Sequence, residues 1–192
     1  MREIQHVLSR IGGPSLEEGR KVKRVLLLRA VNVGGATLPM AELRALAEEL
    51  GATEVSTYIA SGNLICVPPG EAAAFDRALE AAIEARFGFF REVISRTPDE
   101  LQAALGAYPF DRAEPKWCHL YLLASEPTAQ AAEKLQAKAL EEVAVIGCEL
   151  HIRYRNGVGQ SKLTTPVIHS ALGVVGTGRN LATVEKLIGL AA

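Results

Sequence analysis

The feature that most constrains the fold is the near-continuous apolar run VKRVLLLRAVNV at residues 22–33. The run is too short to cross a membrane, and its density of Val and Leu is typical of a strand covered on both faces. We therefore expect a central strand that ends at Gly34-Gly35. A central strand needs partners on both sides, so the segments that follow decide the fold.

The pattern after this strand predicts a ferredoxin-like order of elements. Pro39 suits the first turn of a helix, and Gly51 closes that helix. Two short β-branched stretches flank the turn signature Ser61-Gly62-Asn63 and predict a hairpin. The capping box Thr97–Glu100 predicts the start of a further helix, the last element of this half. The order is β-α-β-β-α-β plus a helix, with the later elements expected at residues 55–60, 64–67, 71–87 and 89–95.

A polar, proline-bearing segment at residues 108–116 separates this pattern from a second one. The second pattern repeats β-α-β-β-α and then ends on helices. The sequence thus predicts an α+β protein with mainly antiparallel sheets and helices on one face. Its expected parts are an N-terminal extension at residues 1–21, a ferredoxin-like half at 22–112 and a second βαββα half with C-terminal helices at 113–192.

Composition argues against several classes of protein. The net charge of −1 gives no bulk attraction for nucleic acid or anionic lipid, although residues 1–30 and 151–192 are each net positive. No apolar run suits a membrane span or the core of a signal peptide, so we expect a cytoplasmic protein without membrane contact. The three separated cysteines predict reduced thiols rather than a disulfide framework.

Two Gly/Asn-rich loops of the first half are expected to meet at one edge of its sheet. The first two strands of a split β-α-β unit run parallel, so their C-terminal ends share that edge. Backbone N–H groups and a helix N-terminus there would favour an anion. The alternative is that these residues only shape turns. The candidate ligand-binding residues are Arg29, Asn32, Gly34, Gly35, Ser61, Gly62 and Asn63.

Two loops of the second half also combine glycines with cations. The stretch RYRNGVGQSK at residues 153–162 lacks the order of a Walker loop, but its glycines and donors favour an anion over a merely solvated loop. The stretch 176–180 opens the final helix and sets an arginine against the helix dipole, which indicates a negative ligand, an internal carboxylate or a structural salt bridge. The candidates here are Arg155, Gly157, Gly159, Ser161, Lys162, Arg179 and Asn180.

Four motifs closely resemble an uncharacterised bacterial family, domain of unknown function 1697, over roughly residues 22–190. They are LLLRAVNVGGATLPMAELRALAEELG, VSTYIASGNLI, YRNGVGQSKL and TGRNLATVEKL. The resemblance implies a two-part α/β fold with ferredoxin-like halves and no established activity. The chain departs from the family pattern at Ala30, at Cys66 and at Leu181-Ala182, which stands where Trp-Asn is usual. If the usual Trp and Asn touch a ligand, this chain binds it differently.

No sequence motif discloses a reaction. The chain lacks GxSxG, HExxH and GxGxxG motifs, and its neighbouring Cys118 and His119 would point to opposite faces of a strand, so we predict no metal and no cofactor. The leading hypothesis is a protein that binds a phosphorylated small molecule or nucleotide through its Gly/Asn/Ser loops and cations. One alternative is a phosphate-ester hydrolase or group transferase, in which those cations stabilise transferred charge. Another is weak nucleic-acid binding by the basic ends, which the missing strand aromatics and the net charge disfavour.

Overall fold

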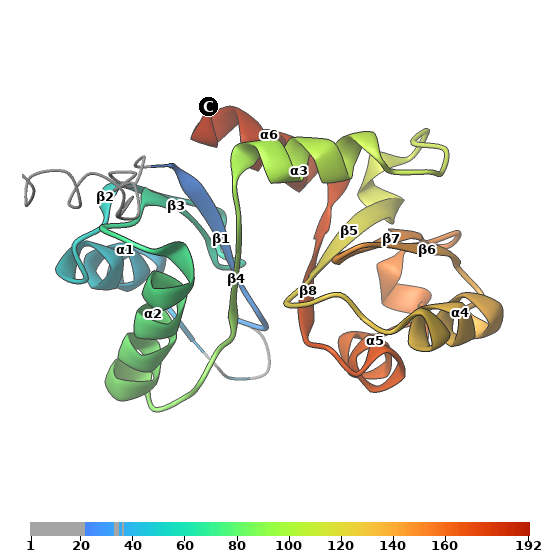
Figure 1. Cartoon of the computed structure of the whole chain (residues 1–192), viewed down its shortest axis with the longest axis horizontal. Helices are drawn as coiled ribbons and strands as arrows, with labels where there is room; N and C mark the ends of the chain where they lie inside the picture. Colours follow the sequence, from blue (N-terminus) through green and yellow to red (C-terminus); the bar gives the residue numbers. More distant parts are fainter. Residues whose placement is uncertain (1–21, 33–34, 36) are drawn as a thin grey trace, which may run out of the picture.

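The structure, a computed structural model, describes residues 22–32, 35 and 37–192 (Figure 1). The predicted extension at residues 1–21 and the candidate Gly34 lie outside the described residues. Within them, two four-stranded antiparallel sheets and six α-helices form an α+β fold. The predicted fold class, with two similarly ordered halves, is therefore confirmed. None of the described helices is long and apolar enough to cross a bilayer.

The first sheet has the strand order β2-β3-β1-β4, which places the apolar run near the middle as expected. β1 is shorter than predicted, because Ala30 (φ 52°) and Asn32 (φ 56°) take left-handed conformations just beyond its end. α1 and α2 connect the strands, and α3 follows β4. The elements are β1 (Arg24–Leu28), α1 (Met40–Glu49), β2 (Thr53–Tyr58), β3 (Asn63–Val67), α2 (Ala72–Phe87), β4 (Val93–Arg96) and α3 (Pro98–Gly106).

The second sheet repeats this arrangement with the order β6-β7-β5-β8. Residues 176–180, which we predicted as a loop, instead form the strand β8 and pair with β5. Glycine favours turns, but Gly178 pairs here with Tyr121, and the missing side chain leaves room for the tyrosine ring. The elements are η1 (Pro115–Trp117), β5 (Cys118–Leu123), α4 (Ala129–Lys138), β6 (Glu142–Ile146), β7 (Glu149–Arg153), η2 (Val158–Gln160), α5 (Thr165–Leu172), β8 (Gly176–Asn180) and α6 (Leu181–Ala191).

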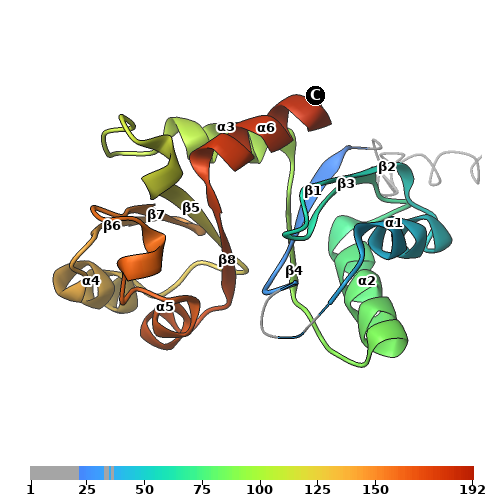
Figure 2. The same cartoon turned by 180° about the vertical axis from the view of Figure 1, so that it is seen from behind.

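Both sheets are covered on both faces. In β1, Leu26 and Leu28 face α1 and α2, whereas Val25 and Leu27 face a layer between the two sheets. The second sheet is built alike, with α4 and α5 on its outer face. α3 and α6 pack against each other and close the central layer at one end, as both views show (Figure 1, Figure 2). The domain boundary after residue 112 stays a prediction, since both halves contribute to this layer.

Candidate functional site

The two loops at the C-terminal ends of β1 and β2 lie side by side, as predicted. The Asn32 side chain donates hydrogen bonds to the carbonyl oxygens of Leu38 (3.1 Å) and Ala60 (2.6 Å) and accepts one from Leu38 N (2.9 Å). The Leu28 N–H donates to Gly62 O at 2.9 Å. Protein groups therefore occupy both ends of the Asn32 amide, which ties the loop after β1 to the hairpin.

Gly62 is required by the geometry of this hairpin. Its φ is +75°, which favours glycine, and a Cβ there would meet Val31 Cγ2 and come within 2.9 Å of Leu28 Cβ. Gly35 also has a positive φ, +88°, but has open space around it. The turn-forming role thus accounts for Gly62, and its role in ligand binding stays a prediction.

Arg179 joins this hairpin to the second half of the chain. Its Nε donates to Asn63 Oδ1 (2.6 Å), and its Nη2 donates to Leu28 O (3.1 Å) and Ser61 O (2.9 Å). Its Nη1 donates to Thr177 Oγ1 (2.9 Å) and to Gly178 O (2.8 Å). All five N–H groups of the guanidinium can be satisfied by these five bonds.

The partners of Arg179 are neutral, so the predicted internal carboxylate or salt bridge is not what holds it within the described residues. Burial lowers the pKa of Arg179 to about 10, which leaves the guanidinium charged at neutral pH. An anion would reach this charge only by displacing a protein acceptor. Asn63 is itself fully buried and donates to Tyr58 O and Ser61 Oγ, both at 3.0 Å.

Two other candidates also have partners in the protein. Arg29 forms an ion pair with Glu92, with 3.1 Å between Nη1 and Oε1, and its backbone N–H donates to the Glu92 carbonyl. Asn180 caps α6, because its side chain accepts from Thr183 N at 2.8 Å. Arg29, Arg179 and Asn180 therefore each have a structural role, and their part in ligand binding stays a prediction.

The loop that contains the remaining candidates lies on the outer face of the second sheet. Its neighbours Tyr154 and Leu163 belong to the apolar cluster under α4 and α5, whereas Arg179 faces the first half. Ser161 Oγ donates to Glu141 Oε1 and accepts from Leu163 N at 2.9 Å. The structure thus brings Arg179 to the hairpin of the first half and leaves this loop, with its candidates Arg155, Gly157, Gly159, Ser161 and Lys162, on another surface.

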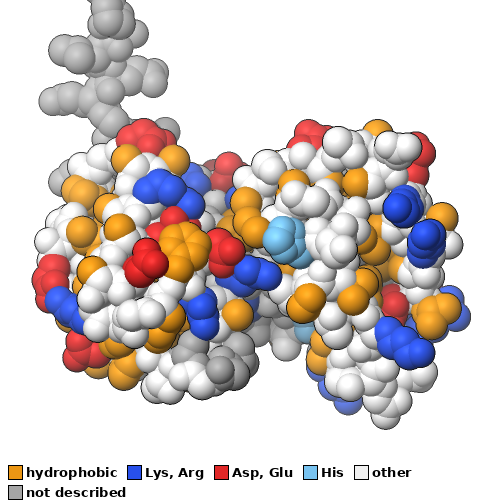
Figure 3. Space-filling model, turned by 90° about the horizontal axis from the view of Figure 1, so that it is seen from below, with side chains coloured by type: hydrophobic (Ala, Val, Ile, Leu, Met, Phe, Trp, Pro, Cys, Tyr) orange, Lys and Arg blue, Asp and Glu red, His pale blue; other side chains and the backbone are white. Residues whose placement is uncertain are grey.

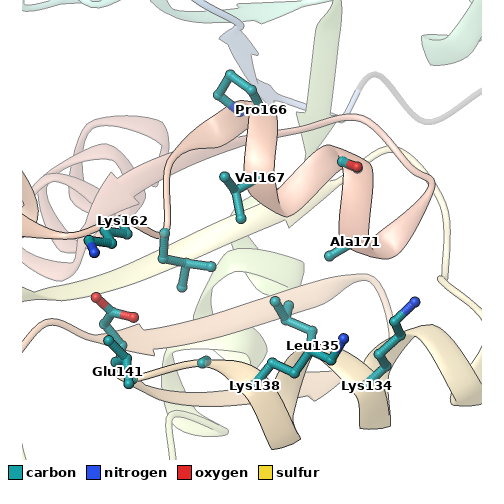
Figure 4. Close-up of a pocket in the computed structure, with 12 residues that line it drawn as sticks. Lys134, Leu135, Lys138, Glu141, Lys162, Pro166, Val167 and Ala171 are labelled. Atoms are coloured by element: carbon teal, nitrogen blue, oxygen red, sulfur yellow. The ribbon is translucent and has the colours of Figure 1, made fainter.

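A groove of about 600 Å³ lies between α4 and α5, beside this loop. Figure 4 shows Pro166, Val167 and Ala171 along one wall and α4 along the other, with Lys162 and Glu141 at one end. The buried Leu135 and Leu163 contribute to its apolar floor. Sequence analysis missed this groove, because its two walls, α4 and α5, come together only in the folded chain.

Cations surround this groove. Lys134, Lys138 and Lys162 are exposed and form no ion pair among the described residues. One acidic side chain, that of Glu141, lines the groove, and its carboxylate accepts a hydrogen bond from the Ser161 hydroxyl. The groove therefore offers three charged donors above an apolar surface.

The fold and the groove define a two-sheet α+β protein with a cation-rimmed surface site, and the part of the chain that the structure describes contains no His/Cys/Asp/Glu group placed to hold a metal. Residues 22–151 match the family described as "Protein of unknown function (DUF1697)", and the chain belongs to that family. No curated protein matches it. One similar solved structure is that of the conserved bacterial protein SP0830 from Streptococcus pneumoniae, with a TM-score of 0.66 and 21% identity over 88% of this chain and 98% of that one. At this identity the likeness concerns the fold alone.

Proposed function

We propose that the protein binds a phosphorylated small molecule or nucleotide in the groove between α4 and α5. The observation that carries the proposal is the set of three lysines around an apolar floor, Lys134, Lys138 and Lys162, which form no ion pair with any residue that the structure describes. Lysine ammonium groups bind phosphate as point charges, and the floor suits a base or another apolar body. The volume lies within the range of roughly 300–1,000 Å³ that is usual for small-molecule sites.

The test is a thermal-shift titration with AMP, ATP, glucose 6-phosphate and inorganic phosphate. A ligand at about 100 times its Kd should stabilise the fold by roughly 2.7 kcal/mol, which is a shift of several degrees in Tm. Lys162→Met and Lys134→Met should each weaken binding by about three- to tenfold, since each removes one charged contact. Lys186→Met, an exposed lysine on α6, is the matched control. No shift with any of the four compounds, or equal effects in all three variants, would refute the proposal.

The enzymatic alternative has one observation in its favour. The Glu141 carboxylate lies in the same groove as Lys162 and accepts a hydrogen bond from the Ser161 hydroxyl. A carboxylate alone is a weak base for a serine hydroxyl, so we rank binding above hydrolysis. Release of phosphate from p-nitrophenyl phosphate that is lost in Ser161→Ala and Glu141→Gln would reverse this ranking.

Nucleic-acid binding receives less support. It requires the cations of the basic ends to form one continuous surface, yet Arg153 is paired with Glu142 and Asp111, and Arg179 is buried. On the face drawn in Figure 3, Lys and Arg side chains form separate patches among acidic and apolar ones. The steep salt dependence expected of phosphate-backbone binding would be the sign that this ranking is wrong.

A further inference from the structure

A second cavity, of about 320 Å³, lies under the N-terminus of α5. It is bounded by β5, by β8 at Gly178 and by the loop that contains η2. Its polar lining consists of His119, Tyr121, Tyr154, Thr164 and Thr165, and no Asp, Glu, Lys or Arg within residues 22–32, 35 and 37–192 lines it. The cavity is separate from the groove, although the two share the side chain of Leu163.

The Tyr121 hydroxyl is the most informative group in this cavity. Tyr121 is only 3% exposed, and its hydroxyl makes no well-aligned hydrogen bond among the described residues, although the Thr165 hydroxyl and the Arg29 guanidinium lie near it. The ring is fixed against β8, because a Cβ on Gly178 would lie 3.0 Å from Tyr121 Cδ2 and one on Gly176 would meet Cε1. The ring therefore packs closely on the two glycines of β8. A buried polar group without a partner is costly and needs an explanation.

A second unpartnered atom lies on the same side of β5. His119 is two residues before Tyr121, so both side chains point to the same face of the sheet. Its Nδ1 is buried and makes no well-aligned hydrogen bond among the described residues, although the Trp117 backbone lies near the imidazole, and its ring packs edge-on against Tyr154 with 5.0 Å between centroids. Burial lowers the pKa of His119, so the imidazole is neutral at neutral pH. The cavity is thus lined by three rings, and two of them carry a buried polar atom, the Tyr121 hydroxyl and His119 Nδ1, that makes no well-aligned hydrogen bond among the described residues.

The electrostatics of this cavity favour a negative group. α5 has eight residues, and the side chain of its first flanking residue, Thr164, caps no backbone N–H, so the positive end of the helix is available. Burial raises the pKa of Tyr121, and the neighbouring Thr165 hydroxyl and Arg29 guanidinium act in the opposite direction. Both of these neighbours would stabilise negative charge beside the phenol, whereas Glu92, the ion-pair partner of Arg29, acts against it.

We infer that this cavity binds a small aromatic carboxylate, with its oxygens at the Tyr121 hydroxyl and the α5 N-terminus and its ring beside His119 and Tyr154. The lining supplies donors and no acidic groups, which suits an acceptor-only anion. No described Lys or Arg lines the cavity, and the nearby Arg29 is already paired with Glu92, so a single charge is favoured over a doubly charged phosphate, because each further buried charge adds a desolvation cost. The small volume and the three rings suit a planar body. This site is independent of the groove proposed above.

The test is a benzoate titration followed by isothermal calorimetry and by the fluorescence of Trp117, the single tryptophan of the chain. Trp117 packs against the same apolar cluster as Tyr121. We expect saturable binding of benzoate, and affinities at least about tenfold weaker for benzyl alcohol and inorganic phosphate. Tyr121→Phe should lower the affinity for benzoate by about tenfold, since it removes one charge-assisted hydrogen bond to the carboxylate. The same variant should change the urea midpoint much less than the loss of a well-formed buried hydrogen bond would, because the hydroxyl makes no such bond among the described residues.

Tyr108→Phe is the matched control. The buried Tyr108 hydroxyl donates to Ile152 O at 2.8 Å, outside the cavity, so its loss should lower the urea midpoint and leave benzoate affinity unchanged. Lys162→Met should also leave benzoate affinity unchanged, which separates this site from the groove. The inference is overturned if benzoate does not bind, if Tyr121→Phe binds it as well as the parent protein, or if phosphate binds as tightly.

Discussion

Replacing Arg179 by methionine should destabilise the protein by breaking its polar link between the two sheets. Methionine keeps much of the length and volume of the side chain, so the change removes the five guanidinium hydrogen bonds without opening a large cavity. Three of the lost acceptors, Leu28 O, Ser61 O and Asn63 Oδ1, belong to the first half of the chain. Each of them would then lack this partner, with Leu28 O and Asn63 Oδ1 in buried surroundings and Ser61 O partly buried.

The magnitude follows from two opposing contributions. Leaving a buried acceptor unsatisfied costs about 1–3 kcal/mol, so three acceptors give roughly 3–9 kcal/mol. Removing a buried charge returns part of its desolvation cost, which amounts to several kcal/mol. We therefore expect a net loss of about 2–4 kcal/mol in the free energy of unfolding, a substantial part of the roughly 5–15 kcal/mol that is typical of a domain.

Urea unfolding followed by circular dichroism and by Trp117 fluorescence would measure this loss. Arg155→Met is the matched control, because Arg155 is exposed and should change the stability by less than about 0.5 kcal/mol. If Arg179→Met unfolds at the same urea concentration as the parent protein, the buried guanidinium contributes no net stability and our account of the link between the sheets is wrong.

Two further predictions concern buried groups. Burial lowers the pKa of His151 to about 4 from 6.5, so its contribution to stability is complete above about pH 6.5 and is lost as pH falls toward 4. Urea midpoints at about pH 7 and pH 4.5 should therefore differ less in His151→Leu than in the parent protein, and an equal difference would contradict the shift. Gly62→Ala should cost about 2–4 kcal/mol through its positive φ and its contact with Val31, whereas Gly35→Ala, in open space, should cost less by the same urea measurement.

The order of elements could be predicted from the sequence because it depends on local signals. The hairpin at Ser61–Asn63, the capping box at Thr97 and the left-handed glycine after α1 each act over a few residues. The Thr97 side chain accepts from Glu100 N at 3.1 Å, as the capping box predicts. The strand β8 was missed because its glycines are explained only by the ring of Tyr121, which lies far away in sequence.

The candidate site was harder to predict, because its residues meet only in the folded chain. Arg179 donates to three acceptors that lie 116–151 residues away in the chain. Two of them are backbone carbonyls, which every residue has, so the sequence cannot mark them as partners. An arginine beside a glycine-rich stretch therefore resembled a ligand-binding residue. The groove likewise needs α4 and α5 to pack together, so Lys134 and Lys138 looked like an ordinary solvated helix face.

The pairing of α3 with α6 has a consequence for the integrity of the chain. α6 follows the second sheet in the chain but also packs on β1 and β3 of the first sheet. Tyr108, just after α3, donates a hydrogen bond to the Ile152 carbonyl in β7 of the second sheet. Each half thus contributes side chains to the hydrophobic core of the other half. A protease cut between α3 and η1 would produce two fragments that remain associated as a nicked complex, because neither has a complete hydrophobic interior without its counterpart. A chain truncated at this point would likewise expose apolar surface and aggregate rather than fold as a stable domain.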